Sequence, residues 1–354
     1  MSTTRMAKRQ VFSIIAGAAL GSAAPRLASA QDMTAAERQL YEAARREGEI
    51  TWYSGQYNAE TSEAVGRAFT ERYPGVRCNV VRSTSQVAFQ RLSQDLRANV
   101  GQCDVLSSTN SGHLVFLKNE RKLTQYRPST ADGLLPALQG VDPDNYFHTT
   151  FAGLFMMAHN TRLVPEQDAP KSWTDVLDPK WKDQIAMGHP GFSGAIGVWA
   201  VQMRKMYGWD YYRRLERNKP LIGRSSQDPV TAMSAGERSV GVCVPLGTTS
   251  VAIQRGNPLR LIYPTEGVLA ALSPSGIIVN APHPNAAKLF MEFQLGPELS
   301  AVVRRFYNPP LRGDVPPPEG VLPMDQITMI APSLAEQETG VPEVREMWRD
   351  TFGV

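Results

Sequence analysis

The chain has 354 residues, too many for one ordinary hydrophobic core, so we expect two lobes. Hydrophobic residues make up 42% and charged residues 20%, which is the composition of an ordinary globular protein. A net charge of only +3 argues against a nucleic-acid partner, and no apolar run approaches the roughly 20 residues that span a bilayer.

The first thirty residues have the pattern of a secretory signal. Three basic residues precede a short apolar stretch at 11–24, and small residues at 28–30 fit a cleavage site. We therefore expect residues 1–30 to be a cleavable signal peptide that directs the chain to the periplasm. Lys8 stands where a twin-arginine signal has its first arginine, so export by Sec and by Tat both stay open.

Three cysteines occur, at Cys78, Cys103 and Cys243. A bridge between Cys78 and Cys103 is open in an exported protein, but we favour three small buried apolar residues. Without a CxxC spacing they do not suggest a metal site.

The first half of the chain alternates strands, polar loops and helices. This alternation predicts a parallel sheet with helices on its faces, hence an α/β fold. In chain order we expect a helix at 35–46 ended by Gly48, a strand at 50–53, a helix capped by Asn58, a strand at 76–81, a helix to Val100 and a strand at 103–106.

The second half repeats the alternation less regularly. A Pro-bounded connector occupies 173–181, and the tail from Arg312 is rich in proline. We expect strands at 151–158, 184–187, 221–222, 240–244 and 277–279, a helix from 194 through Met203, helices at 207–215 and 285–295, and a last helix near 343–352.

Polar loops follow the predicted strands. Ligands of parallel sheets bind beyond the carboxyl ends of the strands, where N–H groups of helix starts favour anionic or polar ligands. Hydroxyl groups and an arginine there suit a carboxylate, phosphate or phosphonate. The candidate ligand-binding residues are Ser54, Gly55, Gln56, Tyr57, Arg82, Ser83, Thr84, Ser108, Thr109, Asn110, Gly191, Phe192, Ser193, Gly194, Arg224 and Ser225.

An ordered set of short strings resembles a known family. The strings are WYSGQ at 52–56, DVLSS at 104–108, NT at 160–161, PKSWTDVL at 170–177, AGE at 235–237 and HPNAAKLF at 283–290. Together they resemble the periplasmic solute-binding proteins of ABC importers (extracellular family 1), in the branch that includes the ferric-ion-binding proteins.

The resemblance implies a two-lobed Venus-flytrap fold of the periplasmic-binding type II class. It places lobe 1 at 31–153 and 273–310 and lobe 2 at 154–272 and 311–354, with hinges near 151–153 and 273–276. It further implies a monomer that captures a small molecule between its lobes and delivers it to an ABC permease in the inner membrane, with no cofactor and no enzymatic activity.

A ferric-binding site is one alternative. Ferric relatives typically use a His after the first strand, an acid after the third and adjacent tyrosines in the second lobe. In this sequence Tyr57 stands at the His position, Thr109 and Asn110 at the acid position, and the segment 245–250 at the position of the tyrosines. Because Fe(III) needs anionic oxygen ligands, we expect no metal and a small polar or anionic organic solute instead. Thr248 and Thr249 in that segment join the candidate ligand-binding residues. A ferric receptor that uses Tyr57 and an external anion stays the alternative.

A secreted hydrolase is the second alternative. The segment 191–195 nearly matches the GxSxG nucleophile elbow, with Ser193 as nucleophile, but its last residue is Ala195. The adjacent Tyr211 and Tyr212 invite a metal interpretation, yet their helical context favours packing.

Overall fold

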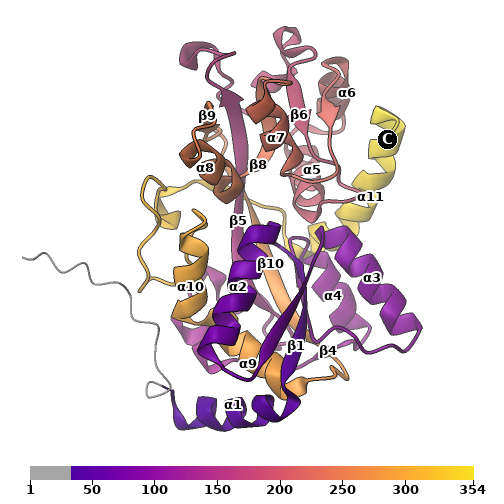
Figure 1. Cartoon of the computed structure of the whole chain (residues 1–354). Coiled ribbons are helices and arrows are strands. Elements are labelled where there is room, and N and C mark those ends of the chain that lie inside the picture. The colour runs from indigo at the N-terminus through magenta and orange to yellow at the C-terminus, as the bar shows by residue number, and fades with distance from the viewer. Residues whose placement is uncertain (1–32) are drawn as a thin grey trace, which may run out of the picture.

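A mixed β-sheet of eleven strands runs through residues 33–354, the part of the chain that this computed structural model describes (Figure 1). The predicted signal peptide lies outside the described residues. The main path of the sheet has the order β2-β1-β3-β10-β5-β8-β6-β7. Helices cover the sheet at both ends, which confirms the predicted α/β class.

The first half of the fold follows the predicted alternation. Strand β1 (Glu49–Gly55) pairs in parallel with β2 (Arg77–Arg82) and β3 (Val105–Ser108). Trp52, Phe69 and Phe290 are buried together in its core. The helices of this half are α1 (Ala35–Glu47), α2 (Ala59–Arg72), α3 (Ser85–Arg97), α4 (Gly112–Asn119), α9 (Pro284–Leu295) and α10 (Pro297–Arg304).

The second half has its own aromatic core, in which Trp173, Trp199 and Tyr212 are fully buried. Its strands are β6 (Ile185–Met187), β7 (Leu221–Ile222), β8 (Val240–Pro245) and β9 (Leu259–Ile262), and its helices are α5 (Gly194–Tyr207), α6 (Asp210–Arg217), α7 (Asp228–Ala235) and α8 (Leu246–Gln254). The short strands β4 (Leu123–Thr124) and β11 (Met329–Ile330) pair with β10. Sequence analysis missed α4, α7, α8 and α10, because their eight or nine residues span too few turns for a clear apolar period.

Two long antiparallel strands connect the halves. Strands β5 (His148–Asn160) and β10 (Val268–Ile278) each cross the predicted lobe boundary (Figure 1). Their register shifts between Ser273 and Pro274, inside the predicted second hinge. The assignment of lobes and hinges stays a prediction.

The C-terminal helix is longer than predicted. Helix α11 spans Leu334–Phe352, whereas the sequence led us to expect a start near residue 343. Pro342 lies inside the helix, and the true start is fixed by a capping box between Ser333 and Glu336. The helix packs on both α4 and α5, so the tail contacts both halves rather than the second alone (Figure 1).

All three cysteines are free thiols in the structure. Cys103 and Cys243 are buried, as expected for small apolar core residues, whereas Cys78 is only half-buried. Across residues 33–354, no helix combines the length and apolarity that a bilayer crossing requires.

The contact of α11 with α4 depends on a glycine. A methyl group on Gly112 would lie 2.9 Å from Cα of Glu338, and backbone cannot move aside as a flexible side chain can. We expect Gly112→Ala to lower the free energy of unfolding by about 1–3 kcal/mol in urea denaturation. The control is Gly101→Ala, whose new methyl group would meet nothing closer than 3.6 Å. Equal stabilities of the two variants would contradict this packing.

Candidate ligand-binding cavity

A narrow cavity lies between the two halves of the fold. The space that the centre of a water molecule can enter is about 50 Å³, whereas one water needs about 10–15 Å³ of it. The cavity thus has room for a small solute. It is lined by Gly55, Gln56, Tyr57, Asn58, Thr61, Arg82, Thr84, Ser85, Thr109, Phe151, Gly153, Leu154, Phe155, Ser193, Ala195, Ser225, Ser226, Gln227, Pro245, Leu246, Thr248 and Asn308.

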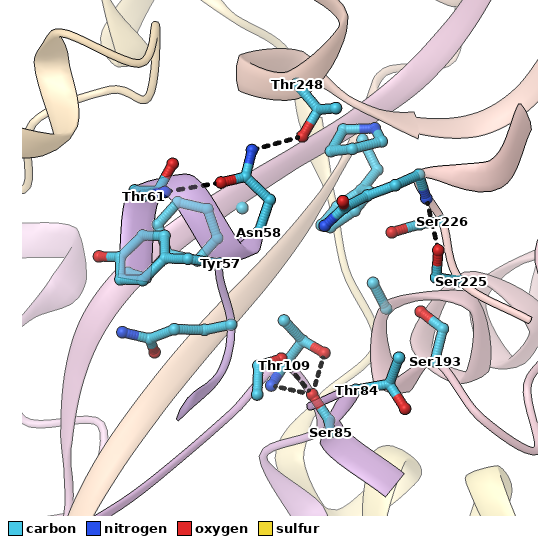
Figure 2. A pocket seen from close by; sticks show the side chains of 18 of the residues that line it. Tyr57, Asn58, Thr61, Thr84, Ser85, Thr109, Ser193, Ser225, Ser226 and Thr248 are labelled. Carbon is cyan, nitrogen blue, oxygen red and sulfur yellow. Dashed lines mark hydrogen bonds between the residues drawn. The ribbon is translucent and has the colours of Figure 1, made fainter. Parts of the chain in front are cut away.

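Hydroxyl groups surround this cavity. In Figure 2, Ser193, Ser225 and Ser226 lie at the right of the cavity and Tyr57, Asn58 and Thr61 at the left. Thr248 lies above it. On a further side, Ser85 Oγ donates to the Gly55 carbonyl at 2.6 Å and accepts from Thr109 N at 3.0 Å. Strand-end loops and helix starts from both halves therefore contribute polar groups to one space.

Within the described residues, five α-helices begin at this cavity. Their N-cap residues, which all line it, are Asn58 of α2, Thr84 of α3, Ser193 of α5, Gln227 of α7 and Pro245 of α8. The first N–H groups of a helix lack intrahelical partners, and the helix dipole adds partial positive charge there. Such a convergence favours an anion.

Two buried polar atoms at the cavity lack a hydrogen-bond partner. They are Nε2 of Gln56, a residue only 6% exposed, and Oγ1 of Thr84. Buried polar atoms without a partner are costly, and here both belong to cavity-lining side chains. Both atoms are fully buried, so a bound ligand could become their partner only after these side chains rotate toward the cavity.

Arg82 is the one ionised side chain among the described residues that line the cavity. Its Nε donates to the Tyr57 carbonyl at 3.0 Å, which fixes the guanidinium beside the cavity. Burial lowers the pKa of Arg82, and the charge of Asp228 acts in the opposite direction. A guanidinium is the most basic side chain in proteins, so Arg82 can pair as a cation with an anionic oxygen.

One side of the cavity is apolar. Residues at alternate positions of β5, namely Phe151, Gly153 and Phe155, all line it. A methyl group on Gly153 would come within 2.7 Å of the Phe155 ring and 3.0 Å of the Phe151 ring, so the glycine makes room for these two rings. Leu246 and Tyr57 complete this surface, the Tyr57 ring lying 4.6 Å from that of Phe151.

The structure brings half of the predicted site residues to the cavity. Those that line it are Gly55, Gln56, Tyr57, Arg82, Thr84, Thr109, Ser193, Ser225 and Thr248. The others are absent from its lining: Ser54, Ser83, Ser108, Asn110, Gly191, Phe192, Gly194, Arg224 and Thr249.

Several of these residues support the cavity from behind. Ser54 Oγ pairs with Ser62 Oγ at 2.9 Å, and Asn110 Oδ1 accepts from Gly112 N at 3.1 Å. Thr249 donates its hydroxyl to the Pro245 carbonyl, as a residue inside α8. Arg224 is exposed, with its guanidinium 4.5 Å from the centre of the Phe192 ring.

Thirteen residues of the described lining were not among the candidates: Asn58, Thr61, Ser85, Phe151, Gly153, Leu154, Phe155, Ala195, Ser226, Gln227, Pro245, Leu246 and Asn308. The signal for Ser85 was available, because it follows a capping residue in a loop already singled out. The β5 residues were assigned to a hinge strand, and nothing in the sequence near Asn308 indicates that its loop reaches the cavity.

The halves also touch each other around the cavity. Gln86 N donates to the Phe192 carbonyl at 3.3 Å, and Asn58 Nδ2 donates to Thr248 Oγ1 at 3.4 Å. A methyl group on Gly194 would lie 2.7 Å from Thr109 Oγ1, so only glycine permits this approach. The two halves are therefore in direct contact around the cavity.

Ser193 does not have the surroundings of a nucleophile. Its Oγ accepts from Ile196 N at 3.5 Å and so caps α5. The nearby His189 uses Nδ1 to accept from Gly191 N, and within the described chain it forms no hydrogen bond with the Ser193 hydroxyl. The near match to GxSxG is thus a helix start.

Metal-binding groups are scarce here. Tyr211 and Tyr212 are buried in the second core and donate to the carbonyls of Trp173 and Ala200, as packing residues do. Tyr57 lines the cavity, but burial raises the pKa of its phenol, which keeps the proton on the oxygen. Over residues 33–354, no cluster of three His, Cys, Asp or Glu residues is placed to hold a metal ion.

Comparisons with known proteins define the class. Residues 104–324, more than half of the chain, match the family model of the bacterial extracellular solute-binding proteins, and the chain belongs to this family. It is therefore a solute-binding component of an ABC transporter, in a family of transport proteins rather than enzymes. Such a component hands its ligand to an ABC permease, and membership of an extracellular family agrees with the predicted export to the periplasm.

Particular relatives share most of its length. A putative 2-aminoethylphosphonate-binding periplasmic protein of Salmonella typhimurium is 25% identical over 284 residues, or 77% of each chain. The periplasmic binding protein AfuA from Actinobacillus pleuropneumoniae, with fructose-6-phosphate bound, superposes with a TM-score of 0.78 at 21% identity, covering 87% of this chain and 99% of that one. Iron-bound HitA from Pseudomonas aeruginosa gives 0.73 at 20% identity, covering 86% and 99%. These structures confirm the type II periplasmic binding fold.

The cavity chemistry predicts a negative result with iron. We expect the purified protein mixed with Fe(III) nitrilotriacetate to show no visible tyrosinate-to-iron absorption band, because Tyr57 is the one phenol at the cavity and burial opposes its ionisation. Tyr57→Phe is the control for non-specific colour. A band in the unmodified protein that disappears in Tyr57→Phe would contradict the prediction.

Proposed function

We propose that this protein captures a small organic anion of the carboxylate, phosphate ester or phosphonate type and delivers it to an ABC permease. The observation that carries the proposal concerns residues 33–354: five helices start at a cavity whose one charged lining residue is Arg82. All of these features favour negative charge.

The unpartnered atoms support the same proposal. Gln56 Nε2 is a donor with two protons, and the Thr84 hydroxyl can also donate. An anionic group that pairs with Arg82 would gain these two donors as further partners if both side chains rotate toward it on binding. A neutral apolar solute would leave these donors buried and unsatisfied, at a cost of about 1–3 kcal/mol each.

The test is a binding screen followed by substitution of two arginines. Thermal-shift measurements with carboxylates, phosphate esters and phosphonates should reveal an anion that stabilises the protein by about 2.7 kcal/mol at a hundredfold excess over Kd. By calorimetry, Arg82→Ala should weaken that anion's binding by about 2–5 kcal/mol, since it removes the charge at the cavity.

Arg224→Ala should change the affinity far less, because Arg224 is exposed and outside the lining. The matched control is Arg213→Ala, an exposed arginine on α6. Circular dichroism verifies the fold of each variant. An affinity that survives Arg82→Ala, or falls equally in Arg213→Ala, would refute the assigned role of Arg82.

A further inference from the structure

We propose that the cavity selects anions whose remaining body carries no charge, and that it rejects analogues with an ammonium group. This inference rests on the proposed function and concerns the end of the ligand opposite its anionic group. Whether the ligand also carries an ammonium group is a real question, because a relative is named for 2-aminoethylphosphonate, which has both a phosphonate and an ammonium group.

An ammonium group in a closed cavity needs a carboxylate or several acceptors. None of the described residues that line this cavity is an aspartate or a glutamate. A buried cation without such partners loses its hydration without compensation. The fixed positive charge of Arg82 and the five helix starts would repel it further.

The acids adjacent in sequence to lining residues are already engaged. Glu60, in the first turn of α2, accepts two hydrogen bonds of 2.9 Å from Arg255. Asp228 accepts from Ser225 N at 3.0 Å and from Ser225 Oγ at 2.7 Å. Both side chains are therefore committed to protein partners at the edge of the cavity.

The apolar side gives the uncharged body its surface. Phe151, Phe155 and Leu246 are at most 6% exposed and present carbon atoms to the cavity. The amide of Asn308 and the hydroxyl of Thr248 add neutral polar groups nearby. Alkyl or hydroxylated bodies fit such walls, whereas a cation finds no carboxylate among the described lining residues, and the charge of nearby Asp228 already acts on Arg82.

The experiment uses sets of ligands with equal numbers of heavy atoms. Propylphosphonate, 2-hydroxyethylphosphonate and 2-aminoethylphosphonate differ only in a terminal CH₃, OH or NH₃⁺ group. Propyl phosphate with phosphoethanolamine, and pentanoate with 4-aminobutyrate, repeat the comparison for the other two anion classes. Kd values are measured by calorimetry on residues 31–354, that is, on the chain without the predicted signal peptide.

In the anion class that binds, we expect the uncharged member to bind on the order of 100-fold more tightly than its ammonium counterpart. Equal affinities, or tighter binding of the ammonium compound, would overturn the inference while leaving the proposed function intact. If neither these compounds nor any anion of the thermal-shift screen binds, the proposed function fails instead.

A variant supplies the missing carboxylate. Asn58 Oδ1 caps α2 by accepting from Thr61 N at 2.8 Å, and Asp is an equally good N-cap residue, so Asn58→Asp should fold normally. We expect it to reduce the preference for the uncharged member at least about tenfold. Asn99→Asp, at an exposed position remote in sequence from the lining, is the matched control and should leave the ratio unchanged. An unaltered ratio in Asn58→Asp would count against the inference.

Discussion

A buried anion is stable only where fixed dipoles and charges replace the water that it loses. For the anion that we propose, the replacement would come from backbone geometry as much as from side chains, because five helices start at one cavity within the described chain. Parallel strands that end at a common edge make this convergence possible, since each following helix must begin there. Arg82 then adds one full charge, and its bond to the Tyr57 carbonyl holds it in place.

The same arrangement links binding to the approach of the two halves. Donors at the cavity come from α2 and α3 on one side and from α5, α7 and α8 on the other, so a ligand that contacts both sets stabilises their contact. The closeness of Gly194 to Thr109 and the ion pair of Glu60 with Arg255 occur where the two halves are in contact. Strands β5 and β10 cross between the halves as continuous chains, which lets the halves move without separating.

Sequence reasoning predicted the elements that have strong local signals. Asn58 and Gly48 mark true helix ends, and the alternation of strands and helices led to the correct fold class. It failed where tertiary packing decides, as at α11, whose capping box was overlooked because Pro342 suggested a break. For the site, half of the candidate residues from loops at strand ends line the cavity, and their role in binding stays a prediction. Which residue of a loop faces the cavity depends on the meeting of two halves, which no local pattern encodes; Arg82 lines it, while the equally plausible Arg224 lies on Phe192.

Fold likeness and ligand identity separate clearly in this family. Proteins with the same architecture are described with bound iron and with bound fructose-6-phosphate, so the frame itself does not determine the ligand. The determinant is the set of side chains at the strand ends and helix starts. A ferric ion requires anionic oxygens on the protein, whereas an organic anion brings its own and requires donors. Here the lining offers hydroxyls, amides, N–H groups and one guanidinium, and its phenol, Tyr57, points its hydroxyl to the Thr150 carbonyl at 3.3 Å. Hydrogen-bond donors in the described lining therefore favour the proposed organic anion, whose oxygens are hydrogen-bond acceptors.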